Sequence, residues 1–414
     1  MRTHSLFSAC YVVLFLTNAY SQKKTFNDAE LQRGQLPAGL TRPMPKVLGW
    51  LDDNRVLLSA KPHPDSPFRA VVLDCKTGKE SPGSEKMLGQ AGRESSAVVM
   101  RDNDLYYREN DKPEIRLTNT PEKEFNPTLS PDKRYVAFTR NNDLYTIALD
   151  TKKENRLTRD GNELILNGYA SWVYMEEILG RSSQYCAFWW SPDSRHIAYF
   201  RSDESKVPEF TMTDAPGLHG VVSSLRYPKV GDPNPEVKVG IVDLSTNATT
   251  WSDFNEKDDQ YFGLPYWMPD GKSLLVQWMN RKQNELKIWQ VNPSDGSKKL
   301  FLNETQKTWI NLDDEGRRIT FLANGKGFIY RSDASGYDHL YYYDMSGKLI
   351  NAITSGNYTV TDVHRIDENR MDQSLAKSAG VISSTSIRTV AGRASGLSRL
   401  VRTLLNFTPR TWRA

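Results

Sequence analysis

The chain has 414 residues and a formal net charge of +4, with 38% hydrophobic and 11% aromatic residues. This composition is typical of a folded globular protein and excludes a disordered chain. The length allows one large domain or two ordinary ones, and the small excess of positive charge lies mostly in the last segment. The charge therefore gives no indication of a nucleic-acid partner for the folded part.

The N-terminus has the pattern of a secretory signal. Arg2 and His4 precede a mostly apolar run over 6–16, and Ala19-Tyr20-Ser21 fits a small-x-small cleavage site. The run is too short to cross a bilayer, and no later stretch is apolar enough to do so. We predict a signal peptide over 1–21 and export to the periplasm or the extracellular space. The alternative is a buried N-terminal helix.

Two cysteines remain beyond the predicted signal peptide, which contains Cys10. Cys75 and Cys186 are far apart and lack the spacing of a zinc site. They form either one disulfide or two separate buried thiols. No nucleotide-binding fingerprint occurs either, and we predict neither a metal nor a cofactor.

Residues 22–47 are polar and rich in Gly and Pro, and we predict an N-terminal extension there. From Leu48 onward a turn followed by a short strand recurs. In the turn, Pro fixes φ at the first corner and Asp bonds the backbone two residues on. The copies are Trp50–Leu58, Ser130–Phe138, Ser191–Tyr199, Met268–Val276 and, in degenerate form, Asp313–Phe321.

A second unit, a strand that contains aromatic residues, accompanies most copies. Its examples are Asp104–Tyr106, Asp143–Tyr145, Glu285–Trp289 and His339–Asp344. Repeated turn-strand-turn-strand units predict an all-β protein, a β-propeller with four-stranded blades. A β-sandwich is the alternative, but sandwiches do not normally repeat one turn signature so often.

Two stretches interrupt the repeat. Residues 161–181 show no clean alternation, and Val173–Leu179 fits a short helical turn. Residues 208–227 form a second long excursion. In a propeller such insertions project from a blade, where loops carry function.

Three sequence blocks in this central part carry a family resemblance. They are Ala170–Arg181 with its Trp-Val-Tyr-Met-Glu-Glu run, Ala187–Asp193 with Trp-Trp-Ser-Pro-Asp, and Arg226–Val239. Their order resembles the N-terminal β-propeller of the dipeptidyl peptidase IV family of serine exopeptidases. The Ala-Ser-Trp-Val-Tyr form is also similar to bacterial prolyl tripeptidyl peptidases. The resemblance covers roughly residues 48–368, which we assign to the propeller, with about six or seven of the family's eight blades.

Glu176 and Glu177 are the candidate substrate-binding residues. Two adjacent carboxylates repel, and each gains from a shared cation. A primary ammonium offers three donors and one charge to such a pair. By spacing alone the two acids form a solvated pair, but the resemblance implies that they bind the free N-terminus of a peptide substrate. Met175 departs from the family's commonest form, which has three Glu in a row.

The resemblance implies further groups that the sequence does not supply clearly. The family holds a substrate carbonyl with a propeller Arg, and Arg93 and Arg101 lie in the right region without a matching pattern. The family's α/β-hydrolase domain places its Ser on a Gly-x-Ser-x-Gly elbow, which this sequence lacks. We therefore assign no catalytic residue and expect no hydrolysis by this chain alone. His196 and His339 lie on predicted strands and are expected to be structural.

Residues 369–414 differ from the rest: Asp372 is their only acid among eight basic residues. Met371-Asp372 reads as Trp when the frame shifts by one base, and the family has a Trp-containing strand there. The segment is thus expected to be a frameshifted product, a disordered basic tail or a short amphipathic helix near 397–405. It lacks interleaved aromatic residues, so no nucleic-acid partner is expected.

These features predict the gating and N-terminus-anchoring propeller of an exported post-proline dipeptidyl or tripeptidyl peptidase. The expected partners are peptides with a free N-terminus and a missing hydrolase domain, and the resemblance also implies a homodimer in the intact form. The alternative is a stand-alone propeller that binds peptides or proteins without catalysis.

Overall fold

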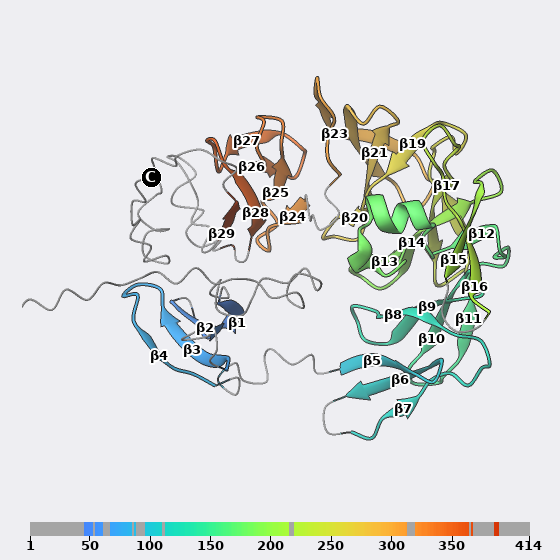
Figure 1. Ribbon diagram of the computed structural model, residues 1–414, viewed down its shortest axis with the longest axis horizontal. Helices are drawn as coiled ribbons and strands as arrows, with labels where there is room; N and C mark the ends of the chain where they lie inside the picture. The colour runs from blue at the N-terminus through green and yellow to red at the C-terminus, as the bar shows by residue number, and fades with distance from the viewer. Residues whose placement is uncertain are drawn as a thin grey trace, which may run out of the picture. The chain divides into compact units, whose positions relative to one another are not determined.

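The computed structural model describes residues 45–52, 54–60, 67–84, 87, 96–109, 112–214, 219–312, 319–363, 366 and 385–388 (Figure 1). Six antiparallel sheets of three to five strands make up nearly all of this part, with only short helical turns. This is the blade arrangement of a β-propeller, so the predicted fold class is confirmed and the sandwich alternative is excluded. No helix within the described ranges is long and apolar enough to span a membrane.

The chain divides into two compact units, and the first comprises residues 1–93 and 402–414. Its described part is one sheet in the order β1-β2-β3-β4. Its buried residues are Val56 and Leu57 of β2 and Val72 of β3. The strands are β1 (Lys46–Trp50), β2 (Arg55–Ala60), β3 (Arg69–Asp74) and β4 (Glu80–Pro82).

The second unit, residues 94–401, begins with two regular sheets that share a core. Leu105 from the first and Phe138 from the second are both fully buried in it. The first sheet contains β5 (Ser96–Arg101), β6 (Asp104–Glu109) and β7 (Ile115–Arg116). The second contains β8 (Phe125–Leu129), β9 (Tyr135–Arg140), β10 (Asp143–Ala148) and β11 (Glu154–Arg156).

The next two sheets have an interrupted first strand. Both β12 and β13 pair with β14, and both β19 and β20 pair with β21. The third sheet contains β12 (Ile165–Asn167), β13 (Phe188–Trp190), β14 (His196–Asp203), β17 (Glu236–Asp243) and β18 (Thr249–Trp251). The fourth contains β19 (Gln260–Phe262), β20 (Tyr266–Trp267), β21 (Leu274–Asn280), β22 (Glu285–Val291) and β23 (Lys298–Thr305).

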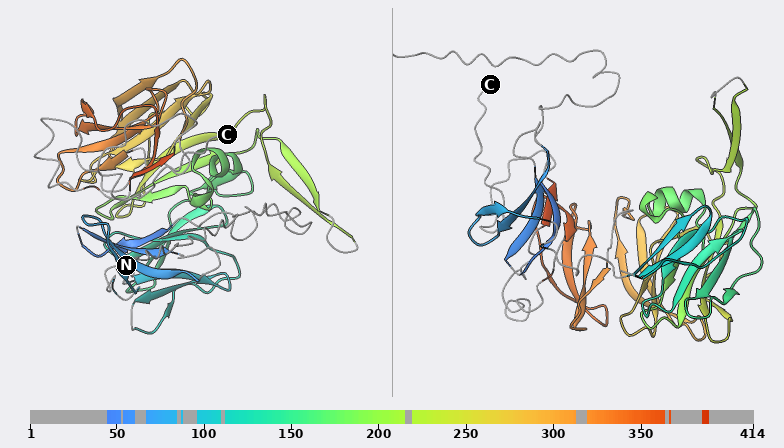
Figure 2. Two further views of the ribbon diagram at one scale, coloured as in Figure 1. Left: turned by 60° about the vertical axis from the view of Figure 1, so that its left-hand side comes forward. Right: turned by 90° about the horizontal axis from the view of Figure 1, so that it is seen from below.

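The predicted excursion over 208–227 is a two-stranded hairpin of β15 (Glu209–Asp214) and β16 (Val221–Arg226). Both views in Figure 2 show it projecting away from the sheets of this unit. Sheet β24–β27 and the pair β28–β29 complete the described strands. They are β24 (Ile319–Phe321), β25 (Gly327–Ser332), β26 (His339–Asp344), β27 (Leu349–Ala352), β28 (Thr359–Val363) and β29 (Thr385–Arg388).

The degenerate repeat copy is described only in part, because its turn over 313–318 lies outside the described residues. Ile319–Phe321, predicted as a strand, is the strand β24 and is the first of its sheet. The strand next to the aromatic strand β26 is β25, and the turn before it is Leu322–Lys326. The Asn324-Gly325 pair supplies this turn without Pro or Asp, and Gly325 has φ +69°. Apart from β29, the predicted segment 369–414 lies outside the described residues.

The other turns have the predicted geometry. Asp132, Asp193 and Asp270 each accept a hydrogen bond from the backbone N–H two residues on, at 3.0–3.1 Å. The turns of neighbouring sheets also touch, because Asp132 donates its N–H to Ser194 Oγ at 3.0 Å. The recurring Ser-Pro-Asp signature therefore closes each turn and also links two sheets.

Candidate functional site

The predicted helical turn lies in the insertion that separates β12 from β13. Its ends are held together by an isolated bridge between Tyr169 and Cys186 and by the hydrogen bond from Ala170 N–H to Tyr185 O, at 2.8 Å. Within it, Tyr174–Ile178 forms a single π-helical turn, η3. Such turns often occur at functional sites. Figure 2 shows the turn at one edge of the sheets and not between them.

Aromatic and aliphatic side chains anchor this turn. Tyr174, Ile178 and Leu179 are buried in the core shared by sheets β12–β18 and β19–β23. The Tyr174 hydroxyl accepts a hydrogen bond from Phe262 N–H at 3.2 Å. Burial raises the pKa of Tyr174 well above its ordinary value, so the phenol stays neutral. Because one face of the turn is buried, Glu176 and Glu177 lie on its other face.

The two acids have different surroundings. The Glu176 side chain is 18% exposed, and both carboxylate oxygens accept from Arg181 Nε at 2.7 Å. Arg181 Nη2 also contacts Oε1 of Glu176. Glu177 is exposed, and within the described residues no hydrogen bond or ion pair holds its carboxylate. The hydrogen bonds and charge of Glu176, and more weakly the charge of Glu177, raise the pKa of Arg181.

Gly180 places Arg181 opposite Glu176. Its φ of 79° and ψ of 154° belong to a region that is open almost only to glycine. The 3₁₀ turn η4 (Arg181–Ser183) begins directly after it. The chain therefore reverses between Glu176 and Arg181, which brings the guanidinium back to the carboxylate.

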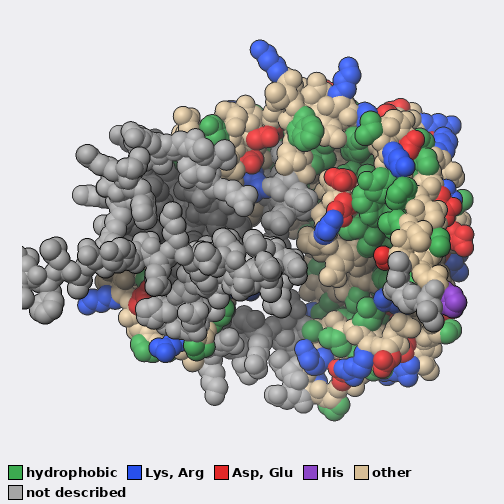
Figure 3. Space-filling view, viewed as in Figure 1, with side chains coloured by type: hydrophobic (Ala, Val, Ile, Leu, Met, Phe, Trp, Pro, Cys, Tyr) green, Lys and Arg blue, Asp and Glu red, His purple; other side chains and the backbone are tan. Residues whose placement is uncertain are grey.

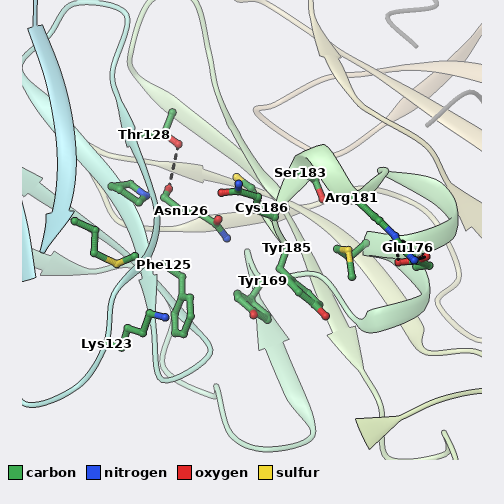
Figure 4. A pocket seen from close by; sticks show the side chains of 14 residues that line it. Lys123, Phe125, Asn126, Thr128, Tyr169, Glu176, Arg181, Ser183, Tyr185 and Cys186 are labelled. Carbon is green, nitrogen blue, oxygen red and sulfur yellow. Dashed lines mark hydrogen bonds and ion pairs between the residues drawn. The ribbon is translucent and has the colours of Figure 1, made fainter. Parts of the chain in front are cut away.

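Glu176 and Arg181 line a cavity of about 880 Å³ (Figure 4). Figure 4 shows this ion pair at one end, Lys123 and Phe125 at the other, and two tyrosines between them. Glu177 is not part of the lining. The lining residues are Met100, Lys123, Phe125, Asn126, Pro127, Thr128, Tyr169, Met175, Glu176, Arg181, Ser183, Gln184, Tyr185 and Cys186.

Aromatic rings form one wall of the cavity. The rings of Tyr169 and Tyr185 stack with centroids 5.0 Å apart, and Phe125 meets Tyr169 edge-on at 5.5 Å. Lys123 Nζ lies 4.8 Å from the centre of the Phe125 ring. Burial and the neighbouring Tyr185 raise the pKa of Tyr169 to about 12. This wall is neutral and suits an apolar group.

Two buried polar atoms of the lining have no hydrogen-bond partner among the described residues. They are Asn126 Nδ2 and Ser183 Oγ. Asn126 lies at a register irregularity of β8 and has φ +55°, which asparagine tolerates better than most residues. Unpaired buried donors are costly, so an oxygen atom of a ligand would stabilise them.

A buried acid lies close to this wall. Glu204 follows β14 and is 6% exposed. Burial raises its pKa to about 7, although the Arg226 charge opposes the shift. After burial and the charge of Glu176, the charge of Glu204 raises the pKa of Tyr185. The carboxyl of Glu204 therefore titrates near neutral pH, although Glu204 is not part of the cavity lining.

The remaining sequence candidates lie elsewhere. Arg101 pairs with Glu114 at 2.9 Å and is not part of the cavity lining, and Arg93 lies outside the described residues. His339 is a buried structural residue as predicted, with its ring nitrogens 3.1 Å from Thr354 Oγ1 and 2.9 Å from Gly356 O. In the described ranges, no group of three or more His, Cys, Asp and Glu side chains could hold a metal ion.

Cys75 and Cys186 are free thiols in this structure. Burial raises the pKa of Cys186 to about 11, and its Sγ donates to Phe188 O at 3.7 Å. The Cys186 thiol, which lines the cavity, therefore stays protonated at neutral pH. On the face shown in Figure 3, acidic and basic side chains lie next to one another around a hydrophobic area of the second unit.

The sequence did not identify Arg181, Asn126 or the aromatic wall as parts of the site. Tyr169 and Tyr185 flank the insertion symmetrically, which was the available signal. Phe125 and Asn126 come from another sheet, and nothing in the sequence pairs them with the insertion.

Comparison with known proteins gives a consistent result. The family model described as "Dipeptidyl peptidase IV (DPP IV) N-terminal region" matches residues 101–372. Dipeptidyl peptidase 4 of Arthroderma otae is 32% identical over 253 residues, which are 58% of this chain and 31% of that protein. Dipeptidyl peptidase 4 of Trichophyton rubrum is 30% identical over 254 residues, 58% of this chain and 32% of that protein.

A solved structure extends the match. The crystal structure of Porphyromonas gingivalis dipeptidyl peptidase 4 is similar with a TM-score of 0.62 and 25% sequence identity, over 83% of this chain and 51% of that chain. The chain thus spans about a third of the length of the curated relatives and about half of the solved chain.

Proposed function

The chain belongs to the family of the dipeptidyl peptidase IV N-terminal region, and from this premise we propose that Glu176 and Glu177 bind the free amino terminus of a peptide. The relatives are named dipeptidyl peptidases. In this proposal, the chain is the substrate-gating and substrate-positioning propeller of an exported serine exopeptidase that acts after proline. Whether it releases dipeptides or tripeptides depends on the distance from the anchored amine to the bond that is cut.

One observation carries this proposal: the family motif places a carboxylate at a cavity while its neighbours are locked in the core. Tyr174 and Ile178 hold the turn, and Glu176 lines the cavity from the opposite face. A rigid support of this kind fixes the position of a charged group, so less entropy is lost when a ligand binds.

The remaining lining has groups for the rest of a short peptide. A primary ammonium donates three hydrogen bonds, which the oxygens of Glu176 and Glu177 accept. The Asn126 amide donates to a peptide carbonyl oxygen, and the stacked rings of Tyr169 and Tyr185 cover an apolar side chain. The chain supplies binding and orientation in this account, and no described residue is assigned to bond cleavage.

Calorimetric titration with Gly-Pro-Ala and with its N-acetylated form tests the proposal. Acetylation removes the charge and two donors but keeps the peptide otherwise unchanged. Charge-assisted hydrogen bonds are stronger than neutral ones, so the free amine should bind about tenfold more tightly or better. Equal affinity for the two peptides would contradict the proposed function.

A further inference from the structure

The Glu176 carboxylate already has a cationic partner within the chain. Arg181 Nε lies 2.7 Å from both of its oxygens, and Nη2 makes a further contact. This is a charge-assisted pair in which one guanidinium occupies the positions that an incoming ammonium would need. A ligand therefore meets a neutralised carboxylate and not a free one.

The pair is built so that it can open. The Arg181 side chain is 78% exposed, and Glu176 is the only ion-pair partner it has among the described residues. Released from Glu176, the exposed guanidinium of Arg181 is solvated by water at little cost. Glu176, which is 18% exposed, would in contrast be left in a largely enclosed position unless another cation replaced Arg181.

We propose that Arg181 is a specificity-determining residue, an internal counterion that competes with the ammonium of the ligand for Glu176. This inference rests on the proposed function of the site. Replacing the Arg181 guanidinium by a ligand ammonium contributes little binding free energy. A simple amine that offers only its charge should therefore bind poorly. A peptide that also contacts the aromatic wall and Asn126 gains enough to displace Arg181.

Two matched variants separate this competition from a general charge effect. Arg181→Gln removes the counterion and keeps a side chain of similar polarity. Lys123→Gln removes the same charge from the same cavity, but Lys123 lies over Phe125 and makes no contact with Glu176. Both side chains are exposed, so both variants should fold.

The test is calorimetric titration of the wild-type chain and both variants with Gly-Pro-Ala and with N-acetyl-Gly-Pro-Ala. Exposed ion pairs contribute modestly, so Arg181→Gln should bind the free-amine peptide about twofold to fivefold more tightly than the wild type. Its affinity for the acetylated peptide should not increase, and Lys123→Gln should gain less. This pattern supports the proposal.

Three other results would overturn it. If the wild type prefers the free amine but Arg181→Gln binds it no better, Arg181 does not compete and the proposed function still stands. If Lys123→Gln gains as much as Arg181→Gln, the effect is a general one of charge. If none of the proteins prefers the free amine to the acetylated peptide, both the competition and the proposed function are wrong.

Discussion

Sheets β8–β11 and β12–β18 carry the same Ser-Pro-Asp turn, and in both the Asp side chain binds the backbone two residues on. They differ in how the chain surrounds their other acids. In sheet β8–β11, Asp143 is fully buried and its oxygens accept from Arg156, Thr158, Gly161 N–H and Asn167. In sheet β12–β18, the insertion displays Glu176 at a cavity with one exposed partner, Arg181.

The comparison separates a structural carboxylate, Asp143, from one that we propose binds a ligand, Glu176. Asp143 has donors from four residues, so no position is left for a ligand, and its loss would leave those donors unpaired. Glu176 is paired with a single cation, the exposed guanidinium of Arg181, which water can solvate when the pair separates. The same chemical group therefore stabilises the fold in one sheet and is available for binding in the next.

The largest effect is expected from Asp143→Ala. Removing one partner of a buried ion pair and its hydrogen bonds should lower the free energy of unfolding by about 3–5 kcal/mol. Glu177→Ala removes the same charge from an exposed position and should change it by less than about 0.5 kcal/mol. Urea denaturation followed by tryptophan fluorescence measures both. Similar losses in the two variants would contradict the distinction between the sheets.

The second effect concerns pH and Glu204. Its pKa is raised from 4.5 to about 7, so the folded state disfavours the ionised form. The associated stability is fully present below pH 4.5 and is lost as the pH rises through 7, on the order of 3 kcal/mol in total. Glu204→Gln should flatten this part of the stability profile. The free energy of unfolding between pH 5 and 8 checks it, and an unchanged slope in the variant would refute the assignment.

A smaller effect is expected from Tyr174→Phe, which keeps the ring and removes the hydroxyl. The Phe262 N–H, which donates a hydrogen bond to this hydroxyl, would then be buried without that partner. The expected loss of stability is about 1–2 kcal/mol. Preference for a free-amine peptide should also weaken if the hydroxyl helps to hold the turn. A variant as stable as the wild type would show that packing alone anchors η3.

Much of the fold was predictable because its turns are local. The Ser-Pro-Asp turns at Ser130 and Ser191 and the Met-Pro-Asp turn at Met268 each precede a strand, since Pro and Asp determine the turn by themselves. The sequence did not single out the turn at Asn324-Gly325, because it is made by residues other than Pro and Asp. The helical turn over Val173–Leu179 was also predicted, and the structure has a π-helix at Tyr174–Ile178.

The site was only partly predictable. The motif singled out Glu176 and Glu177, but not that Glu176 lines a cavity while Glu177 does not. Arg181 is five residues from Glu176, a spacing that an α-helix does not bring together, and the backbone conformation of Gly180 allows the contact. The cavity wall also depends on contacts between sheets, which local sequence does not specify.

The most direct test of the central claim is a thermodynamic cycle between ligand and protein. Gly-Pro-Ala and its N-acetylated form are titrated into the wild type and into a Glu176→Gln/Glu177→Gln variant. A second double variant, Glu163→Gln/Glu209→Gln, removes two exposed acids that do not line the cavity and serves as the control. The account predicts that the wild type and the control prefer the free amine by about tenfold or more and that this preference disappears in the first variant. A first variant that keeps the full preference would show that the two glutamates do not bind the amino terminus.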